Sequence, residues 1–168
     1  LNSTETKGMS EAAGEDFEED TFSRVNVLQK IGFKANDKLS FEFFGNYDRI
    51  KNTFDNSFDG IIANADDLNN NSFSEQFRIG FLPKYKYNKG EFAINAGAST
   101  IDRILNITNS WSVTIDNYNY SGRSASIDAF NKYNFSKQVY LVLGAQYQYF
   151  DMKQNTNGVV DVIKENAK

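Results

Sequence analysis

The sequence at 25–48 reads VNVLQKIGFKANDKLSFEFFGNYD and contains two runs in which apolar and polar residues alternate. Successive side chains of a strand point to opposite faces of a sheet, so a two-residue period predicts two strands, each with one apolar face. Asn36, Asp37 and Lys38 lie between the runs and supply turn chemistry. The stretch therefore predicts a β-hairpin. Its apolar face consists of Val25, Val27, Ile31, Phe33, Leu39, Phe41, Phe43 and Tyr47.

The same period recurs further along the chain. It predicts strands at 73–87, 92–99, 124–133 and 139–149. Short turns at 88–90 and 134–137 join these strands in pairs, whereas long polar segments at 49–71 and 103–120 separate the pairs. Short turns at one end and long loops at the other are typical of outer-membrane barrels. We therefore predict an all-β fold, an antiparallel up-and-down transmembrane β-barrel segment of about six strands.

The composition supports a β-fold and bounds the function. The chain has 15 Phe and 9 Tyr against one Pro, and aromatic side chains suit the pleated surface of a sheet. It has no Cys and no His, which removes thiolate metal sites and the usual general base, so we expect no enzymatic activity. A net charge of -4 argues against nucleic-acid binding. The termini, 1–20 and 152–168, are polar without periodicity and are expected to be loops.

The apolar face changes in composition along the strands. Aromatic residues lie toward the strand ends and aliphatic or small residues in the middle, while the opposite face is charged and rich in amides. This pattern predicts a lipid-facing band between two aromatic girdles, around a wet interior. A soluble β-sandwich or a lipocalin-like cup also alternates and remains the structural alternative. The residues expected to face lipid are Ile31, Phe41, Ile79, Ile94, Ile127 and Leu143, and those expected to face the interior include Lys30, Arg78 and Gln146.

A family resemblance rests on two short segments, GMSEA at 8–12 and DTFSR at 20–24, the second of which leads into a strand. It also rests on the succession of strand, short turn, strand and Asp-rich loop. On these features the chain, over roughly residues 8–152, resembles part of a TonB-dependent outer-membrane receptor of the Bacteroidetes type, similar to the cobalamin and siderophore receptors. The resemblance implies that residues 1–168 form part of a single barrel domain in the outer membrane. Six strands cannot close a barrel, because the smallest known barrels have eight, so we expect a segment of a longer receptor.

The resemblance also implies a function and partners. The expected function is uptake of a scarce small-molecule nutrient, such as cobalamin, a siderophore or an oligosaccharide. The expected partners are outer-membrane lipid, TonB acting through a plug domain that is not in this chain, and a surface lipoprotein. The alternatives are a small structural or adhesive outer-membrane barrel and a soluble β-sandwich that acts as a binding module.

The residues at 55–66, DNSFDGIIANAD, follow much of the spacing of an EF-hand calcium loop. Oxygen ligands fall at positions one, three, five and twelve, a glycine at six permits the turn, and position seven offers a carbonyl. Position nine is alanine, so water would serve there. The candidate Ca²⁺ ligands are Asp55, Ser57, Asp59, Ile61 and Asp66, with Asp48 near enough in sequence to assist. The alternative is a solvated turn whose side chains hydrogen-bond locally. In the cobalamin receptors that the chain resembles, calcium orders extracellular loops, so the resemblance favours a calcium site here.

Overall fold

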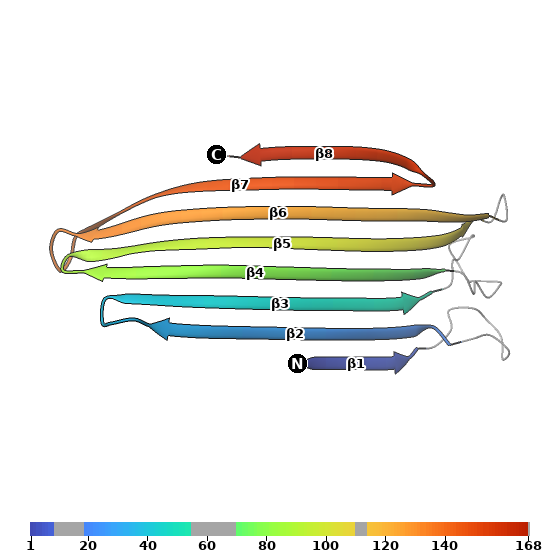
Figure 1. The fold of residues 1–168 in the computed structure, drawn as a ribbon, viewed down its shortest axis with the longest axis horizontal. Helices are drawn as coiled ribbons and strands as arrows, with labels where there is room; N and C mark the ends of the chain where they lie inside the picture. Colours follow the sequence, from blue (N-terminus) through green and yellow to red (C-terminus); the bar gives the residue numbers. More distant parts are fainter. Residues whose placement is uncertain (9–18, 55–69, 110–113, 168) are drawn as a thin grey trace.

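The chain forms one antiparallel β-sheet in which the strands follow each other in sequence order (Figure 1). The computed structural model describes residues 1–8, 19–54, 70–109 and 114–167, and the described part contains no helix. The all-β, up-and-down architecture predicted from the alternation is therefore confirmed. The strands are β1 (Asn2–Lys7), β2 (Thr21–Lys34), β3 (Leu39–Thr53), β4 (Asn71–Tyr87), β5 (Gly90–Asn109), β6 (Thr114–Asn134), β7 (Tyr140–Thr156) and β8 (Val159–Ala167).

No helix in the described residues is long and apolar enough to cross a membrane.

Three short turns lie at one end of the sheet, called the turn end below, which is on the left in Figure 1. Asn36 closes the β2–β3 turn, because its Oδ1 accepts hydrogen bonds from the backbone N–H groups of Lys38 and Leu39, both at 2.9 Å. Ser136 Oγ has the same role before β7 and accepts the N–H groups of Gln138 and Val139 at 3.2 and 3.1 Å. The turns predicted from Asn and Ser chemistry are confirmed.

The strands are longer and more numerous than the sequence predicted. The sheet has eight strands rather than about six, because β1 and β8 form in the termini that we expected to be loops. Most of 103–120 is also strand, since β5 continues to Asn109 and β6 begins at Thr114. These added segments are held by backbone pairing with their neighbours, and their apolar residues do not alternate with polar ones over a long run.

A fourth turn lies at the opposite end of the sheet, called the far end below, and joins β7 to β8. Asn157 and Gly158 adopt positive φ angles of 49° and 91°. Two consecutive positive φ angles match the twist of a two-residue hairpin, and the Asn-Gly dipeptide is a strong signal for it. This turn reverses the chain so that Val159 pairs with Thr156.

Amide side chains connect the strands near the far end. Asn106 Nδ2 donates to Asn71 Oδ1 at 2.9 Å, and Asn117 Nδ2 donates to Asn106 Oδ1 at 2.6 Å. The fully buried Asn70 accepts a hydrogen bond from the backbone N–H of Thr108 at 2.6 Å. This amide ladder bridges β4, β5 and β6, so the long strands stay paired beyond the apolar part of the sheet.

The sheet is staggered and open. Leu39, the first residue of β3, is in register with Tyr85, Phe92, Asn131 and Leu143 on the following strands, and β7 begins at Tyr140, three residues before Leu143. The first residue of β7 therefore lies about 10 Å further along the strand direction than the first residue of β3, four strands away. A displacement in one direction is what tilted strands in a barrel wall require. Within the described residues β1 pairs only with β2, and β8 only with β7, so the sheet does not close.

The two faces of the sheet differ in exposure. Along β6, Arg123, Ala125 and Ile127 are exposed, whereas the intervening Ser124 and Ser126 are half-buried. In this part of β6 the face of Ser124 and Ser126 is therefore the more sheltered one. Below, the face that carries Ile127 is called the apolar face, and the face that carries Ser126 is called the polar face.

Candidate functional site

A band of exposed apolar side chains covers the apolar face next to the turn end. On β3 it runs from Leu39 to Tyr47, and on β4 from Phe77 to Tyr87. Ile31, Ile79, Ile127 and Leu143 expose 56%, 48%, 50% and 65% of their surface. The register places all six residues predicted for this face on it: Ile31, Phe41, Ile79, Ile94, Ile127 and Leu143. The predicted shared face is therefore confirmed, and Lys30, Arg78 and Gln146 lie on the opposite face.

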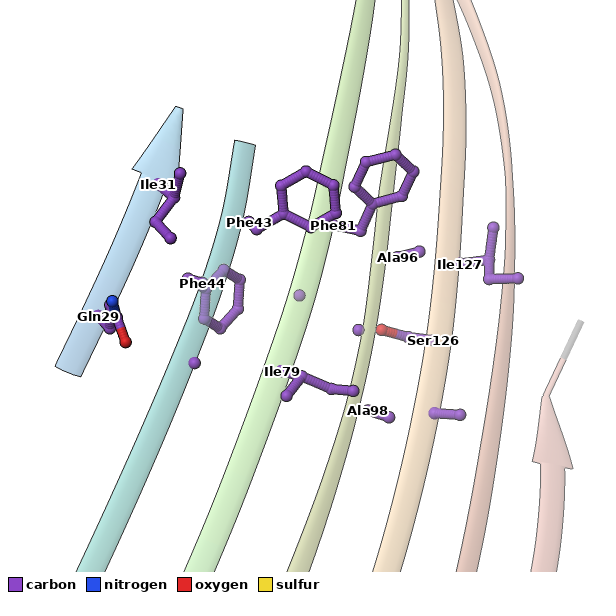
Figure 2. A pocket seen from close by; sticks show the side chains of 14 residues that line it. Gln29, Ile31, Phe43, Phe44, Ile79, Phe81, Ala96, Ala98, Ser126 and Ile127 are labelled. Carbon is purple, nitrogen blue, oxygen red and sulfur yellow. The ribbon is translucent and has the colours of Figure 1, made fainter. Parts of the chain in front are cut away.

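The centre of the band contains a hollow of about 690 Å³ (Figure 2). Small residues from three strands, Gly45, Ala96, Ala98 and Ala125, line it together with larger neighbours. A Cβ built on Gly45 meets no atom within 4 Å, so this position is open. The larger side chains around the hollow are Ile31, Phe43, Ile79, Phe81 and Ile127. Below, this feature is called the apolar hollow.

The edge of the band nearest the far end combines aromatic rings with charges. The Tyr47 hydroxyl donates a hydrogen bond to Glu75 Oε1 at 2.7 Å. Arg49 Nε lies 3.9 Å from the same oxygen, and its guanidinium lies 5.3 Å from the centre of the Phe73 ring. Lys51 Nζ lies 5.6 Å from that ring. The face thus changes from apolar to charged within one or two residues on β3 and β4.

The opposite edge of the band, at the turn end, is also aromatic. The Tyr87 hydroxyl lies 2.8 Å from Asn131 Oδ1 and 3.1 Å from the Lys132 carbonyl oxygen, and it can donate to either. Tyr133 and Phe135 pack edge to face with ring centres 5.0 Å apart. The register therefore places aromatic residues at both edges of the band, as predicted. They are Tyr47, Phe77 and Tyr149 at one edge and Tyr85, Tyr87, Phe92 and Tyr133 at the other, with Phe73 just beyond the first, whereas Tyr147 lies in the row of Phe43, inside the band.

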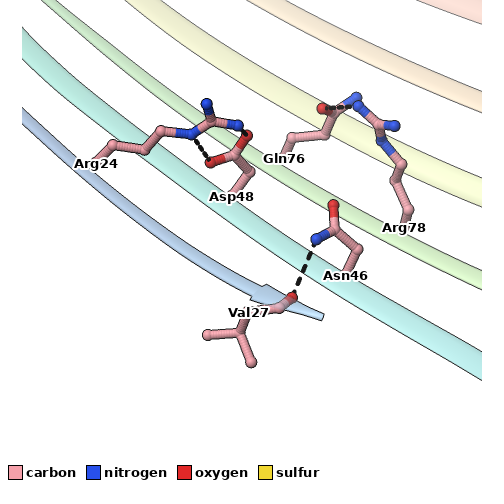
Figure 3. A network of polar contacts seen from close by, with 6 residues as sticks. All are labelled: Arg24, Val27, Asn46, Asp48, Gln76 and Arg78. Atoms are coloured by element: carbon pink, nitrogen blue, oxygen red, sulfur yellow. Dashed lines mark hydrogen bonds and ion pairs between the residues drawn. The ribbon is translucent and has the colours of Figure 1, made fainter. Parts of the chain in front are cut away.

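The polar face carries charges that are paired across strands. Arg24 donates from Nε and Nη2 to the two carboxylate oxygens of Asp48, at 2.9 and 2.6 Å (Figure 3). Nearby, Asn46 Nδ2 donates to the Val27 carbonyl at 3.1 Å. Further ion pairs join Lys30 to Glu42 at 2.7 Å and Lys84 to Glu91 at 3.4 Å. Each pair is at least partly exposed, so this face is built for contact with water.

Asp48 lies one residue beyond the apolar band on β3. The hydrogen bond from the Arg24 guanidinium is the main cause that lowers the pKa of Asp48 from its ordinary value, and the charges of Arg24 and Arg78 add to it. Partial burial opposes this shift. The same pair raises the pKa of Arg24, so both groups remain ionised at neutral pH. The carboxylate proposed as an assisting calcium ligand is therefore already engaged by an arginine.

The other candidate calcium ligands, Asp55, Ser57, Asp59, Ile61 and Asp66, lie outside the described residues. The prediction of a calcium site at 55–66 therefore stays a prediction. Among residues 1–8, 19–54, 70–109 and 114–167, no group of three or more Asp or Glu side chains is placed to hold a metal ion.

Beyond the band, toward the far end, both faces carry charged as well as apolar side chains, which the sequence reasoning missed. The apolar face carries Arg49, Glu75, Asp102, Arg123 and Asp151 there. The polar face carries exposed Ile101, Phe150, Met152 and Ile163. In β5 the apolar residues of the band lie at even positions up to Ala98, whereas beyond Ala98 they fall at even and odd positions, at Ile101, Ile104 and Leu105. This loss of the two-residue period hides the continuation of the strand.

The arrangement thus provides two distinct surfaces. One is an exposed apolar band with aromatic edges, and the other is a partly exposed polar face with paired charges. Both derive from the same alternating strands, since neighbouring residues point to opposite sides. Comparisons of this chain with protein-family models, curated proteins and solved structures found no match.

Proposed function

We propose that these eight strands form part of the wall of an outer-membrane β-barrel, and that the barrel is a TonB-dependent receptor that takes up a scarce small-molecule nutrient. The observation that carries the proposal is the exposed apolar band on one face, backed at the same level by a charged face. A soluble sheet would cover such a band, because large exposed apolar patches mark contact with a partner or a membrane. In a barrel wall, lipid covers the band and water fills the interior.

The length of the band supports a bilayer as its partner. Leu39–Tyr47 on β3 and Phe77–Tyr87 on β4 correspond to about 9 and 11 residues, the length that a tilted strand needs to cross the hydrocarbon core. Aromatic rings at both edges suit the two membrane interfaces, where one side of a ring is apolar and the other is wet. Charged residues such as Arg49 begin where the band ends, and β3 and β4 continue into the aqueous phase.

The open edges support a wall that extends on both sides. Within the described residues, β2 from Val27 to Lys34 and β7 from Tyr140 to Tyr147 have a strand on one side only. An unpaired backbone N–H or C=O in hydrocarbon costs several kcal/mol, so spanning strands must be paired on both sides. Further strands beside β2 and β7 satisfy this requirement, and the stagger of the sheet fits the tilt of a closed wall.

In this proposal the polar face lines the passage and meets the plug and the nutrient. Paired charges such as Arg24 and Asp48 keep that face hydrated without a large net charge. We take the far end as the external side, because the turns before β3, β5 and β7 lie at the other end and outer-membrane barrels have short turns on the periplasmic side. Uptake then depends on TonB acting through a plug domain outside this chain, with a surface lipoprotein as a further partner. The resemblance of 8–12 and 20–24 supports this choice of receptor family.

Spin labels on the complete protein in lipid vesicles test the proposal. Labels at Ile79 and Ile127 should collide with a lipid-soluble relaxant, whereas labels at Arg78 and Asp128 should collide with a water-soluble one. The alternation should be strongest inside the band, because there one face meets hydrocarbon and the other meets water. Equal accessibility of all four labels to the water-soluble relaxant would show that the band does not face a membrane.

A further inference from the structure

A second, polar hollow lies on the same face just beyond the apolar hollow. It measures about 40 Å³ and is lined by Ser121, Arg123, Asp151 and Lys153. Arg123 lies two residues before Ala125 on β6, and Ala125 lines the apolar hollow. Two residues along a strand correspond to about 7 Å and keep both side chains on one face. The two hollows are therefore neighbours along β6.

The polar hollow has an unused acceptor and an unpaired cation. Asp151 Oδ1 is buried and has no hydrogen-bond partner in the described structure, while Oδ2 accepts the Tyr149 hydroxyl at 3.2 Å. A buried carboxylate oxygen without a donor is costly, so a donor from outside the chain would stabilise it. Arg123 is exposed and forms no ion pair within 4.0 Å among the described residues. Its guanidinium is therefore available to an anion.

The apolar hollow complements this polar site. Its volume of about 690 Å³ lies within the 300–1,000 Å³ of typical small-molecule sites. In a bilayer there is no hydrophobic force that favours protein over lipid, so selective contact comes from packing. A hydrocarbon chain that lies beside Gly45 makes van der Waals contacts with the side chains around the hollow. These contacts are absent when the hollow is empty.

We propose that the two hollows bind one lipid whose headgroup carries a phosphate and a free hydroxyl. An acyl chain fills the apolar hollow, the phosphate lies between Arg123 and Lys153, and the hydroxyl donates to Asp151 Oδ1. The charges favour a lipid with net negative charge, because two cations flank the single carboxylate in this hollow. The inference rests on the proposed function, since it requires the apolar band to face a bilayer.

Native mass spectrometry of the complete protein, released from nanodiscs of equal parts phosphatidylglycerol and phosphatidylcholine with identical acyl chains, tests the inference. Phosphatidylglycerol should be retained about tenfold over phosphatidylcholine, since one charge-assisted hydrogen bond corresponds to roughly that factor. Arg123→Gln should abolish the preference. Gly45→Leu should fill the apolar hollow and lower the retention of both lipids. Gly32→Leu is the matched control and should behave as wild type, since a Cβ there also meets no atom within 4 Å and the residue lies on the polar face.

The outcomes separate this inference from the proposed function. A spin label at Ile127 that meets water rather than lipid would overturn both. A lipid-facing label together with equal retention of the two lipids, or with a preference unaffected by Arg123→Gln, would overturn the lipid site alone. A third outcome is that the wild-type protein forms a dimer, that Gly45→Leu abolishes the dimer, and that lipid retention stays unchanged. This outcome would assign the apolar hollow to a second copy of the chain and overturn the lipid site.

Discussion

A charge placed at the centre of the apolar band should destabilise the protein strongly in lipid. Ile127 exposes 50% of its surface and lies in register with Ala96 and, on β7, with Tyr147. Its row also contains Phe43, the middle residue of the band on β3. Ile127→Arg should therefore cost about 2–4 kcal/mol, the cost of an arginine on the lipid face near the bilayer midplane.

The matched control changes the neighbouring face. Gln146 is exposed on the polar face of β7 and is in register with Asp128. Gln146→Arg places the same charge next to a carboxylate in water, where the expected effect stays within about 0.5 kcal/mol. The two variants thus differ in the medium that the new charge meets.

Urea unfolding of the complete protein refolded in lipid vesicles measures the difference. With a slope of about 2 kcal/mol per M, the midpoint of Ile127→Arg should fall by about 1–2 M, while that of Gln146→Arg should stay near wild type. A loss of similar size in both variants would refute the distinction between the faces. An Ile127→Arg variant as stable as wild type would refute the assignment of the band to hydrocarbon.

Three further expectations follow from particular positions. Gly80→Ala should cost about 1–3 kcal/mol in the same unfolding assay, because a Cβ there would overlap the ring of Phe44, whereas Gly97→Ala, with only a 3.4 Å contact to the Ile79 carbonyl oxygen, should be nearly neutral. Gly158→Val should strain the hairpin turn by about 1–2 kcal/mol, and hydrogen exchange in β8 should accelerate while β3 stays protected. Joint substitution of Asp55 and Asp59 by Ala should abolish calcium binding in calorimetric titration of the complete protein; unchanged binding and unchanged protease sensitivity at 55–66 would leave an ordinary polar turn.

Much of the turn half of the sheet could be predicted from the sequence. The alternation in 25–48 determined both strands of the first hairpin and which residues share a face. Asn36 and Ser136 determined two turns, because their side chains hydrogen-bond to backbone groups two or three residues ahead. These features depend on neighbours in the chain, so a local pattern is enough to find them.

The added strands could not be predicted in the same way. β1 and β8 were expected to be loops because their sequences show no extended apolar alternation. Backbone pairing with β2 and β7 makes them strands, and that pairing is visible only in the folded sheet. The Asn-Gly turn at 157–158 is a local signal that would have revealed β8.

The candidate sites depend on register, which the tertiary structure alone decided. The apolar hollow joins Gly45, Ala98 and Ala125, which come from three strands and lie far apart in the sequence. Asp48 meets Arg24 because β2 and β3 pair with a fixed offset, and Asp151 reaches the polar hollow because β7 lies beside β6. Alternation determines on which face a side chain lies, since that depends on the backbone of one strand. Which side chains become neighbours depends on the hydrogen-bonded register between strands, and therefore only the assembled sheet determines it.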